Sequence, residues 1–161
     1  MNSVKIFTVG GTIDKVYFDA KSTYEVGPPN ISEVLADLSL NMEFDVTSLM
    51  KKDSLEMTDD DREIVRKAIV GTDATMIVIT HGTDTMVQTA QCLKDILDKT
   101  IVLTGALAPA LFKSSDAMFN IGCALTAVQI KQPGVYIAMN GQVFDYDKVR
   151  KDVANNKFSS L

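Results

Sequence analysis

Apolar residues along this chain fall into short runs of strand length, separated by longer stretches with helical periodicity. Strands are predicted where β-branched or alternating apolar residues cluster, at residues 4–9, 43–50, 75–80, 101–104 and 135–139. Helices are predicted where apolar residues recur every three to four positions, at residues 30–38, from 58 onward, 84–97 and 115–131. Because continuous apolar runs are typical of strands buried on both faces, the pattern favours a parallel sheet covered by helices.

This alternation of strands and helices predicts an α/β fold, with one doubly wound domain over residues 1–161. We expect a mostly parallel, roughly five-stranded sheet with helices on both faces, plus a C-terminal hairpin that turns at Asn140-Gly141. Residues 11–29 are predicted to form an unusually long loop, of the kind that often carries function. The polar segment 145–161 is expected to end the chain without a closing element.

Composition and charge narrow the classes of function. The chain has 161 residues, enough for one domain with a sizeable core. A net charge of −5 without a basic stripe argues against a nucleic acid partner, and strand-sized apolar runs argue against a membrane span. The N-terminus has no signal-peptide pattern, so a cytoplasmic location is expected.

Cys92 and Cys123 are predicted to be buried free thiols. A single histidine cannot anchor a His-rich metal site, and we expect neither a metal nor a cofactor.

Two turns rich in glycine and hydroxyl groups follow predicted strands and carry most of the functional information. The first is Gly10-Gly11-Thr12-Ile13 and the second is Thr80-His81-Gly82-Thr83-Asp84-Thr85. Ligands bind at the carboxyl ends of strands in open α/β sheets, which is where both turns are expected. The Thr12 hydroxyl is a candidate nucleophile, although a threonine hydroxyl needs a base or a proton relay to attack. Taken alone, the first turn favours a simple strand cap.

The second turn supplies such a relay. Lys151, from the C-terminal segment, can polarise the Thr83 hydroxyl while the Asp84 carboxylate holds the lysine charge or accepts its proton. The simpler interpretation is that Thr83 or Asp84 is the N-cap of the helix that follows, and both interpretations can hold at once. His81 is interpreted as a hydrogen-bonded structural histidine rather than as a base, because its neighbours already supply the chemistry.

Three further positions are candidates for the same site. Ser54 and Glu56 follow the strand predicted at 43–50 and so belong to the ligand edge of the sheet, although a polar loop would also explain them. Tyr24 lies in the long loop, either as a surface aromatic or as part of a lid over the site. The acidic triplet Asp59–Asp61 is interpreted as a helix cap rather than as a metal cluster, because acidic side chains are favourable in the first turn of a helix.

Together, the two turns resemble the threonine motifs of the bacterial-type L-asparaginase family, and the resemblance extends across almost the whole chain. Residues 10–13 resemble the first motif and residues 80–86 the second. The run Leu103–Pro109 is similar to a third motif of the family, with Ala108 in place of the usual arginine. The resemblance implies an amidohydrolase that converts L-asparagine into aspartate and ammonia through a threonine nucleophile and a covalent acyl-enzyme.

The resemblance also implies roles for individual residues. Catalysis falls on Thr12, Tyr24, Thr83, Asp84 and Lys151, and substrate binding on Gly11, Ser54, Glu56, Thr83 and Asp84. Backbone N–H groups near Gly11 and Thr83 would stabilise the oxyanion. Members of the family usually have a second, C-terminal domain, which is expected to be absent here. A short chain of this kind is expected to form a homodimer or a homotetramer.

Two other functions stay open at this point. A non-catalytic amino-acid-binding or regulatory module would retain the pocket without the chemistry, and the expected lack of the second domain's acidic residue favours it. The other is a subunit of a transamidase that acts on acylated tRNA, although the acidic charge of the chain argues against it.

Overall fold

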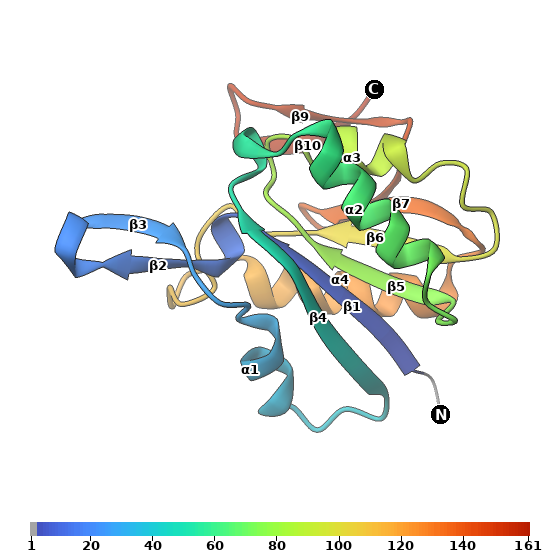
Figure 1. The fold of residues 1–161 in the computed structure, drawn as a ribbon, viewed down its shortest axis with the longest axis horizontal. Helices are drawn as coiled ribbons and strands as arrows, with labels where there is room; N and C mark the ends of the chain where they lie inside the picture. Colours follow the sequence, from blue (N-terminus) through green and yellow to red (C-terminus); the bar gives the residue numbers. More distant parts are fainter. Residues whose placement is uncertain (1–2) are drawn as a thin grey trace.

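A six-stranded sheet forms the centre of the molecule in the computed structural model, which describes residues 3–161 (Figure 1). Its strands lie in the order β4-β1-β5-β6-β7-β8. Their bounds are β1 Ser3–Gly10, β4 Glu43–Lys52, β5 Met76–Thr80, β6 Thr100–Thr104, β7 Gly134–Met139 and β8 Gln142–Asp145. The first five strands are parallel, and β8 is antiparallel to β7. The expected doubly wound, mostly parallel fold is therefore confirmed, with an antiparallel sixth strand at one edge.

Helices cover both faces of the sheet. They are α1 Ile31–Ala36, α2 Asp59–Val70, α3 Met86–Cys92 and α4 Ala117–Ile130. α1 and α4 pack on one face, and α2 and α3 on the other (Figure 1). Neighbouring residues of a strand therefore belong to different buried clusters: Ile6 packs in the cluster with α1 and α4, and Phe7 in the cluster with α2 and α3. This two-sided burial fixes the strand register, because a shift by one residue would exchange the two faces.

The order of the strands places a crevice between β1 and β5. From β1 the chain crosses to β4 on one side, and then returns to β5 on the other side of β1. In doubly wound sheets, such a reversal leaves an opening at the carboxyl ends of the two strands, where ligands bind. The two glycine-threonine turns follow the ends of these strands at Gly10 and Thr80. The predicted position of the site at the sheet edge thus coincides with the switch point of the fold.

Residues 11–29 do not form the long loop that the sequence predicts. They contain an antiparallel hairpin, β2 (Lys15–Phe18) and β3 (Thr23–Val26), with short 3-10 turns at Thr12–Asp14 and Asp19–Lys21. The hairpin projects away from the sheet (Figure 1). Each of its strands has only four residues, which is too short for a periodic pattern to show.

The predicted turn at Asn140-Gly141 is confirmed. It joins the antiparallel strands β7 and β8, with Met139 paired to Gln142. The φ angles of Asn140 and Gly141 are 54° and 76°, and a type I′ turn requires positive φ at both positions. An asparagine followed by a glycine tolerates this conformation better than other pairs do, which is why the turn could be recognised from two residues.

Residues 145–161 contain a closing element that the sequence did not reveal. It is a second antiparallel pair, β9 (Val149–Asp152) and β10 (Lys157–Ser160). Val149 and Phe158 are buried in the core cluster next to α2 and α3 and dock the pair onto the domain. One apolar anchor in each strand was too weak a signal among polar residues to predict the pair.

α3 is shorter than the helix predicted over 84–97. It ends at Cys92, and Leu97, at the end of the predicted range, is 80% exposed. Side-chain periodicity does not report where backbone hydrogen bonding stops. Cys92 is exposed and Cys123 is half-buried, which corrects the expectation of buried thiols, although both cysteines are free as predicted.

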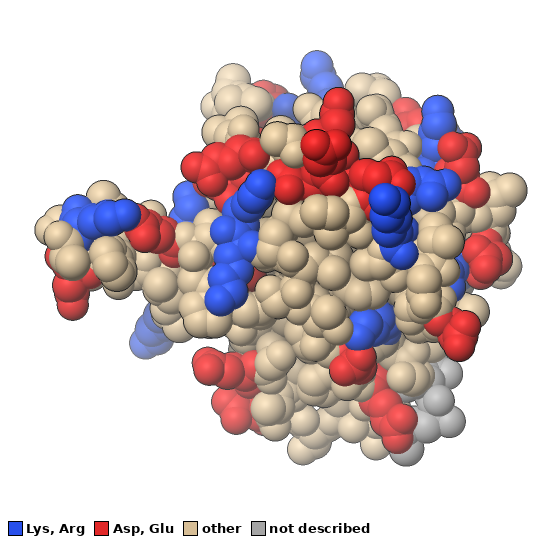
Figure 2. Space-filling model, viewed as in Figure 1, with Lys and Arg blue, Asp and Glu red and all other residues tan. Residues whose placement is uncertain are grey.

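The acidic triplet Asp59–Asp61 forms the first turn of α2, and Asp61 takes part in its cap, as predicted. The Thr58 hydroxyl accepts a hydrogen bond from the Asp61 N–H, and the Asp61 carboxylate accepts one from the Thr58 N–H. Lys52 Nζ donates to both oxygens of that carboxylate, at 2.8 and 3.0 Å. These hydrogen bonds, the one from Lys52 most of all, lower the pKa of Asp61. Figure 2 shows acidic side chains gathered where α2 begins, whereas Lys and Arg lie singly over this face.

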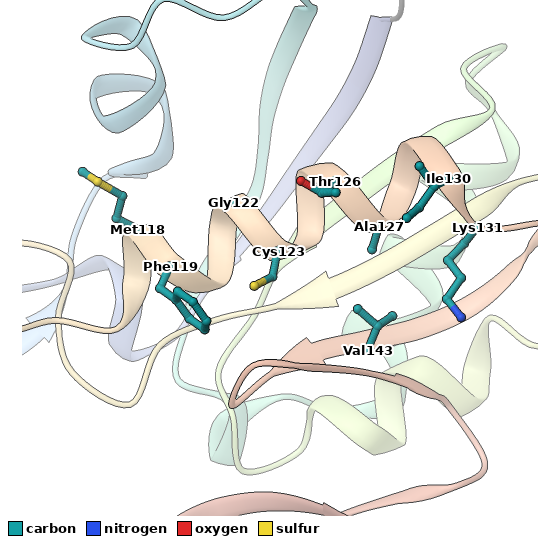
Figure 3. A pocket seen from close by; sticks show the side chains of 9 residues that line it. All are labelled: Met118, Phe119, Gly122, Cys123, Thr126, Ala127, Ile130, Lys131 and Val143. Carbon is teal, nitrogen blue, oxygen red and sulfur yellow. The ribbon is translucent and has the colours of Figure 1, made fainter.

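α4 presents an apolar outer side to solvent. The helix has no charged residue, and its Met118, Phe119 and Ile130 side chains are exposed. With Val143 of β8, they line a groove of about 540 Å³ (Figure 3). Apolar surface of this kind is typical of a face that contacts another protein. In the described part of the chain, neither α4 nor any other helix is long and apolar enough to cross a membrane.

Candidate active site

Three turns meet in backbone contact at the switch point between β1 and β5. A Cβ atom at Gly11 would lie 2.4 Å from the nitrogen and the Cα of Gly82, and one at Gly82 would lie 2.7 Å from the Cβ of Ser54. No side chain fits at such separations, so only glycine permits this approach. Gly11 also has a φ of 89°, which favours glycine. The turns that carry Thr12, Thr83 and Ser54 are thereby held against one another.

Lys151 reaches this point from β9. Its Nζ donates hydrogen bonds to the Thr83 hydroxyl at 2.8 Å and to the Asp84 carboxylate at 2.7 Å. The Lys151 and Thr83 side chains are largely buried, whereas Asp84 is exposed. Three side chains that the sequence places far apart are therefore in direct contact. Because lysine donates to the Thr83 oxygen, the proton of the Thr83 hydroxyl stays available for another acceptor.

The interpretation of Thr83 or Asp84 as a helix N-cap is wrong. The N-cap of α3 is Thr85, and its side chain makes no capping hydrogen bond. Instead, the Thr85 hydroxyl donates to the Ser54 carbonyl at 2.7 Å, and the Thr85 N–H donates to the buried Ser54 hydroxyl at 3.3 Å. Thr85 thus ties the second glycine-threonine turn to the 3-10 turn Ser54–Glu56, and Thr83 and Asp84 are left to contact Lys151.

Tyr24 and Glu56 lie apart from this contact. Both line a polar cavity of about 340 Å³ between the hairpin and the end of β4. Tyr24 is exposed, and its ring lies 5.5 Å from that of Phe112, edge to face. Asp84 and Lys151 line a different cavity, of about 310 Å³. The structure therefore does not gather all the predicted site residues in one pocket.

The root of the hairpin contains a buried carboxylate. Asp14 is 2% exposed, and its Oδ1 accepts a hydrogen bond from the Asn30 N–H at 2.9 Å. Its Oδ2 has no hydrogen-bond partner among the described residues. Burial raises the pKa of Asp14 from 3.8 to about 6. The Gly27 N–H donates to the Asp14 carbonyl, and the Asn30 side chain donates to the Ile13 carbonyl. Both ends of the hairpin are therefore fastened beside Thr12.

His81 is buried beneath the second turn, with no exposed surface. Its Nδ1 lies 2.6 Å from the Gly82 carbonyl oxygen, and its Nε2 lies 2.7 Å from the Thr89 hydroxyl. Desolvation lowers the pKa of His81 from 6.5 to about 4, so the ring is neutral at pH 7. These contacts agree with the interpretation of His81 as a hydrogen-bonded structural residue.

Sequence reasoning missed the polar residues that support the turns from the helices. Thr89 of α3 contacts the His81 ring, and Asn120 Nδ2 of α4 donates to the Gly105 carbonyl at 2.9 Å. Both side chains are buried. A polar residue on the apolar side of a predicted helix needs a buried partner, and this signal could have identified them.

These features define a class of protein, a doubly wound α/β domain with hydroxyl, carboxylate and amine groups gathered at its switch point. Residues 3–160 match the family model described as asparaginase, N-terminal. The chain therefore belongs to the asparaginase family and corresponds to its N-terminal domain.

Individual relatives show the same similarity. The chain is 30% identical over 171 residues to the glutaminase-asparaginase of Acinetobacter glutaminasificans, covering 94% of this chain and 50% of that protein. It is 32% identical over 162 residues to the probable periplasmic L-asparaginase of Haemophilus influenzae, covering 92% of this chain and 46% of that protein. The crystal structure of L-asparaginase I from Vibrio cholerae matches with a TM-score of 0.85 at 26% identity, over 99% of this chain and 51% of that one. The chain thus spans about half the length of the relatives it matches.

Proposed function

We propose that this chain supplies the catalytic centre of an L-asparagine amidohydrolase that releases aspartate and ammonia. The contact of Lys151 with Thr83 and Asp84 carries this proposal, because it joins a proton relay to a turn that abuts Gly11. Similarity to proteins named L-asparaginase and glutaminase-asparaginase supports the substrate class.

In the proposed reaction, the Thr12 hydroxyl attacks the carbon of the substrate's side-chain amide. Backbone N–H groups near Gly11 and Thr83 stabilise the tetrahedral oxyanion, by about 3 kcal/mol for each donor. The C–N bond then breaks, the nitrogen takes up the proton that Thr12 released, and ammonia leaves. Thr12 retains the acyl group as an ester, which water hydrolyses to aspartate.

The relay would serve the proton transfers in both steps. Lys151 polarises the Thr83 oxygen, and the Thr83 hydroxyl takes up the proton of Thr12 as it passes its own proton to the leaving nitrogen, while Asp84 balances the lysine charge. Asp84 is exposed and can also bind the α-amino group of the substrate. The Ser54 hydroxyl would donate a hydrogen bond to the α-carboxylate of the substrate, since its oxygen already accepts one from the Thr85 N–H.

The hairpin would complete the site. Tyr24 is proposed to reach the substrate when the hairpin folds inward over the polar cavity. Glu56 lines the same cavity and would provide an acidic contact to the substrate's amino group.

Ammonia release from L-asparagine by the purified chain tests this proposal, with L-glutamine assayed beside it. Thr12→Ala should abolish release and leave the circular dichroism spectrum unchanged. Thr75→Ala, at an exposed threonine before β5, is the matched control and should retain full activity. Near-wild-type activity of Thr12→Ala would remove Thr12 from the nucleophile role. A folded wild-type chain that binds aspartate without releasing ammonia would support the non-catalytic binding module.

We also propose that the chain self-associates as a homodimer or a homotetramer. The apolar groove along α4 supports this proposal. Covering the water-exposed Phe119 and Ile130 side chains with another surface lowers the free energy of the system. A monomeric mass in light scattering at micromolar concentration would contradict it. The cytoplasmic location stays a prediction, since one of the relatives is named as periplasmic.

A further inference from the structure

A series of hydrogen-bonded, buried side chains extends from helices α2 and α3 to the second glycine-threonine turn. Arg62 Nε, on α2, donates to the Thr89 hydroxyl of α3 at 3.1 Å. The Thr89 hydroxyl in turn contacts Nε2 of His81, and His81 Nδ1 contacts the Gly82 carbonyl. Arg62, Thr89 and His81 are at most 8% exposed, so water does not compete for these hydrogen bonds.

Hydrogen-bond chemistry fixes the position of each proton along these contacts. The Gly82 carbonyl can only accept, so His81 Nδ1 must carry a hydrogen. Because the ring is neutral at pH 7, its Nε2 carries none and accepts the hydroxyl proton of Thr89. The Thr89 oxygen then accepts from Arg62. Every donor therefore points the same way, from Arg62 toward Gly82.

The Gly82 carbonyl belongs to the peptide that leads into Thr83. In a trans peptide, the C=O and the N–H point in opposite directions, and the described residues contain no cis peptide. Because the carbonyl is held on the His81 ring, the Thr83 N–H points away from that ring. Gly82 also packs against the backbone of Gly11 and against Ser54, so this peptide has little room to rotate.

We infer that His81 is a positioning residue for amide hydrolysis, which acts with Thr89 and Arg62 to fix the Gly82–Thr83 peptide so that the Thr83 N–H faces the oxyanion. This inference rests on the proposed function, because the oxyanion arises only in that reaction. The same fixed peptide sets the direction of the Thr83 side chain, whose oxygen accepts from Lys151. The role of His81 is thus to orient a donor, and it requires no proton transfer by the ring.

The ring can be observed directly, because His81 is the only histidine among the 161 residues. Labelling histidine with ¹⁵N gives an NMR spectrum of this ring alone in the wild-type protein. We expect a hydrogen on Nδ1, and a ring that stays neutral as the pH is lowered to 5. A hydrogen on Nε2, or protonation near the ordinary histidine pKa of about 6.5, would overturn the inference.

Variants of Thr89 test the effect on the reaction. Thr89→Val removes the hydroxyl with little change in shape, and Thr89→Ser keeps the hydroxyl as the matched control. We expect Thr89→Val to lower kcat for asparagine by about tenfold to a hundredfold, somewhat less than deletion of an oxyanion donor, and to leave KM within about threefold. Thr89→Ser should keep kcat close to that of the wild type.

The values of kcat are compared per folded protein, measured by circular dichroism, because a purely structural role would lower the folded fraction without lowering its turnover. An active wild type with an unchanged kcat in Thr89→Val would overturn the positioning role and leave the proposed function intact. A wild type that releases no ammonia would overturn the proposed function, and the positioning role with it.

Discussion

The strand-end turns and the β2-β3 hairpin carry neighbouring parts of the candidate site, yet they are built in opposite ways. At the turns, Gly11 and Gly82 approach more closely than any side chain permits, and His81 beneath them is fully buried. In the hairpin, most side chains are exposed, Tyr24 among them. The hairpin is fastened at its root, where the buried Asp14 carboxylate accepts a hydrogen bond from the Asn30 N–H.

This difference matches the role that we propose for each region. Groups that react must be held within a fraction of an ångström, which requires packing from several elements at once. A segment that admits a substrate needs few contacts beyond its attachment points, so that it can move without unfolding the domain. Substitutions at the turns should therefore change chemistry and stability strongly, and substitutions at the hairpin root should change how stability depends on pH.

The largest effect is expected from the relay. Lys151→Met keeps most of the unbranched side chain but removes the donor to Thr83 and Asp84, and should lower kcat/KM for asparagine by about 10²- to 10⁴-fold. Lys148→Met is the matched control, because Lys148 is exposed and forms an ion pair with Asp145 at the surface. Both variants are assayed by ammonia release. Equal activity of Lys151→Met and Lys148→Met would contradict a role of Lys151 in the proton relay.

The second largest effect is expected where the turns approach each other closely. Gly11→Ala would place a Cβ atom against the Gly82 backbone at a positive φ, and should lower the free energy of unfolding by about 2 to 5 kcal/mol. Gly122→Ala is the control within α4, where a Cβ meets nothing within 4 Å and should stabilise the helix by about 0.5 to 1 kcal/mol. Urea unfolding measures both changes. A similar stability for the two variants would show that the turns can separate without cost.

The smallest effect concerns the hairpin root and depends on pH. The pKa of Asp14 is about 6 in the folded chain and 3.8 ordinarily, so its contribution to stability is full below pH 3.8 and is lost as the pH rises through 6. The loss at pH 8 is on the order of 3 kcal/mol. Asp14→Asn cannot ionise and should lack this dependence in urea unfolding between pH 4 and pH 8. Asp19→Asn, at the exposed hairpin tip, should keep the wild-type pH profile. If the stability of the wild type and of Asp14→Asn changed with pH in the same way, the raised pKa of Asp14 would be contradicted.

The sequence by itself determined the sheet, its class and the two glycine-threonine turns at its edge. Strands buried on both faces must be apolar throughout, so β5 and β6 are visible as continuous runs. Only glycine permits the turns before Thr12 and Thr83, which marks them without any knowledge of the fold. The Asn140-Gly141 turn and the cap of α2 were predictable for the same reason, since each depends on residues adjacent in the chain.

Only the tertiary structure decided which of these groups meet. Lys151 and Thr83 lie 68 positions apart, and Arg62 and Thr89 lie 27 apart, so no local pattern reports their contacts. The same holds for the docking of β9 and β10 by Phe158, and for the placement of Tyr24 and Asp84 at two different cavities. Local patterns record whether a residue prefers water or the core and which backbone angles it tolerates. Contacts between distant residues depend on how whole elements pack, because packing is what brings such residues within hydrogen-bonding distance.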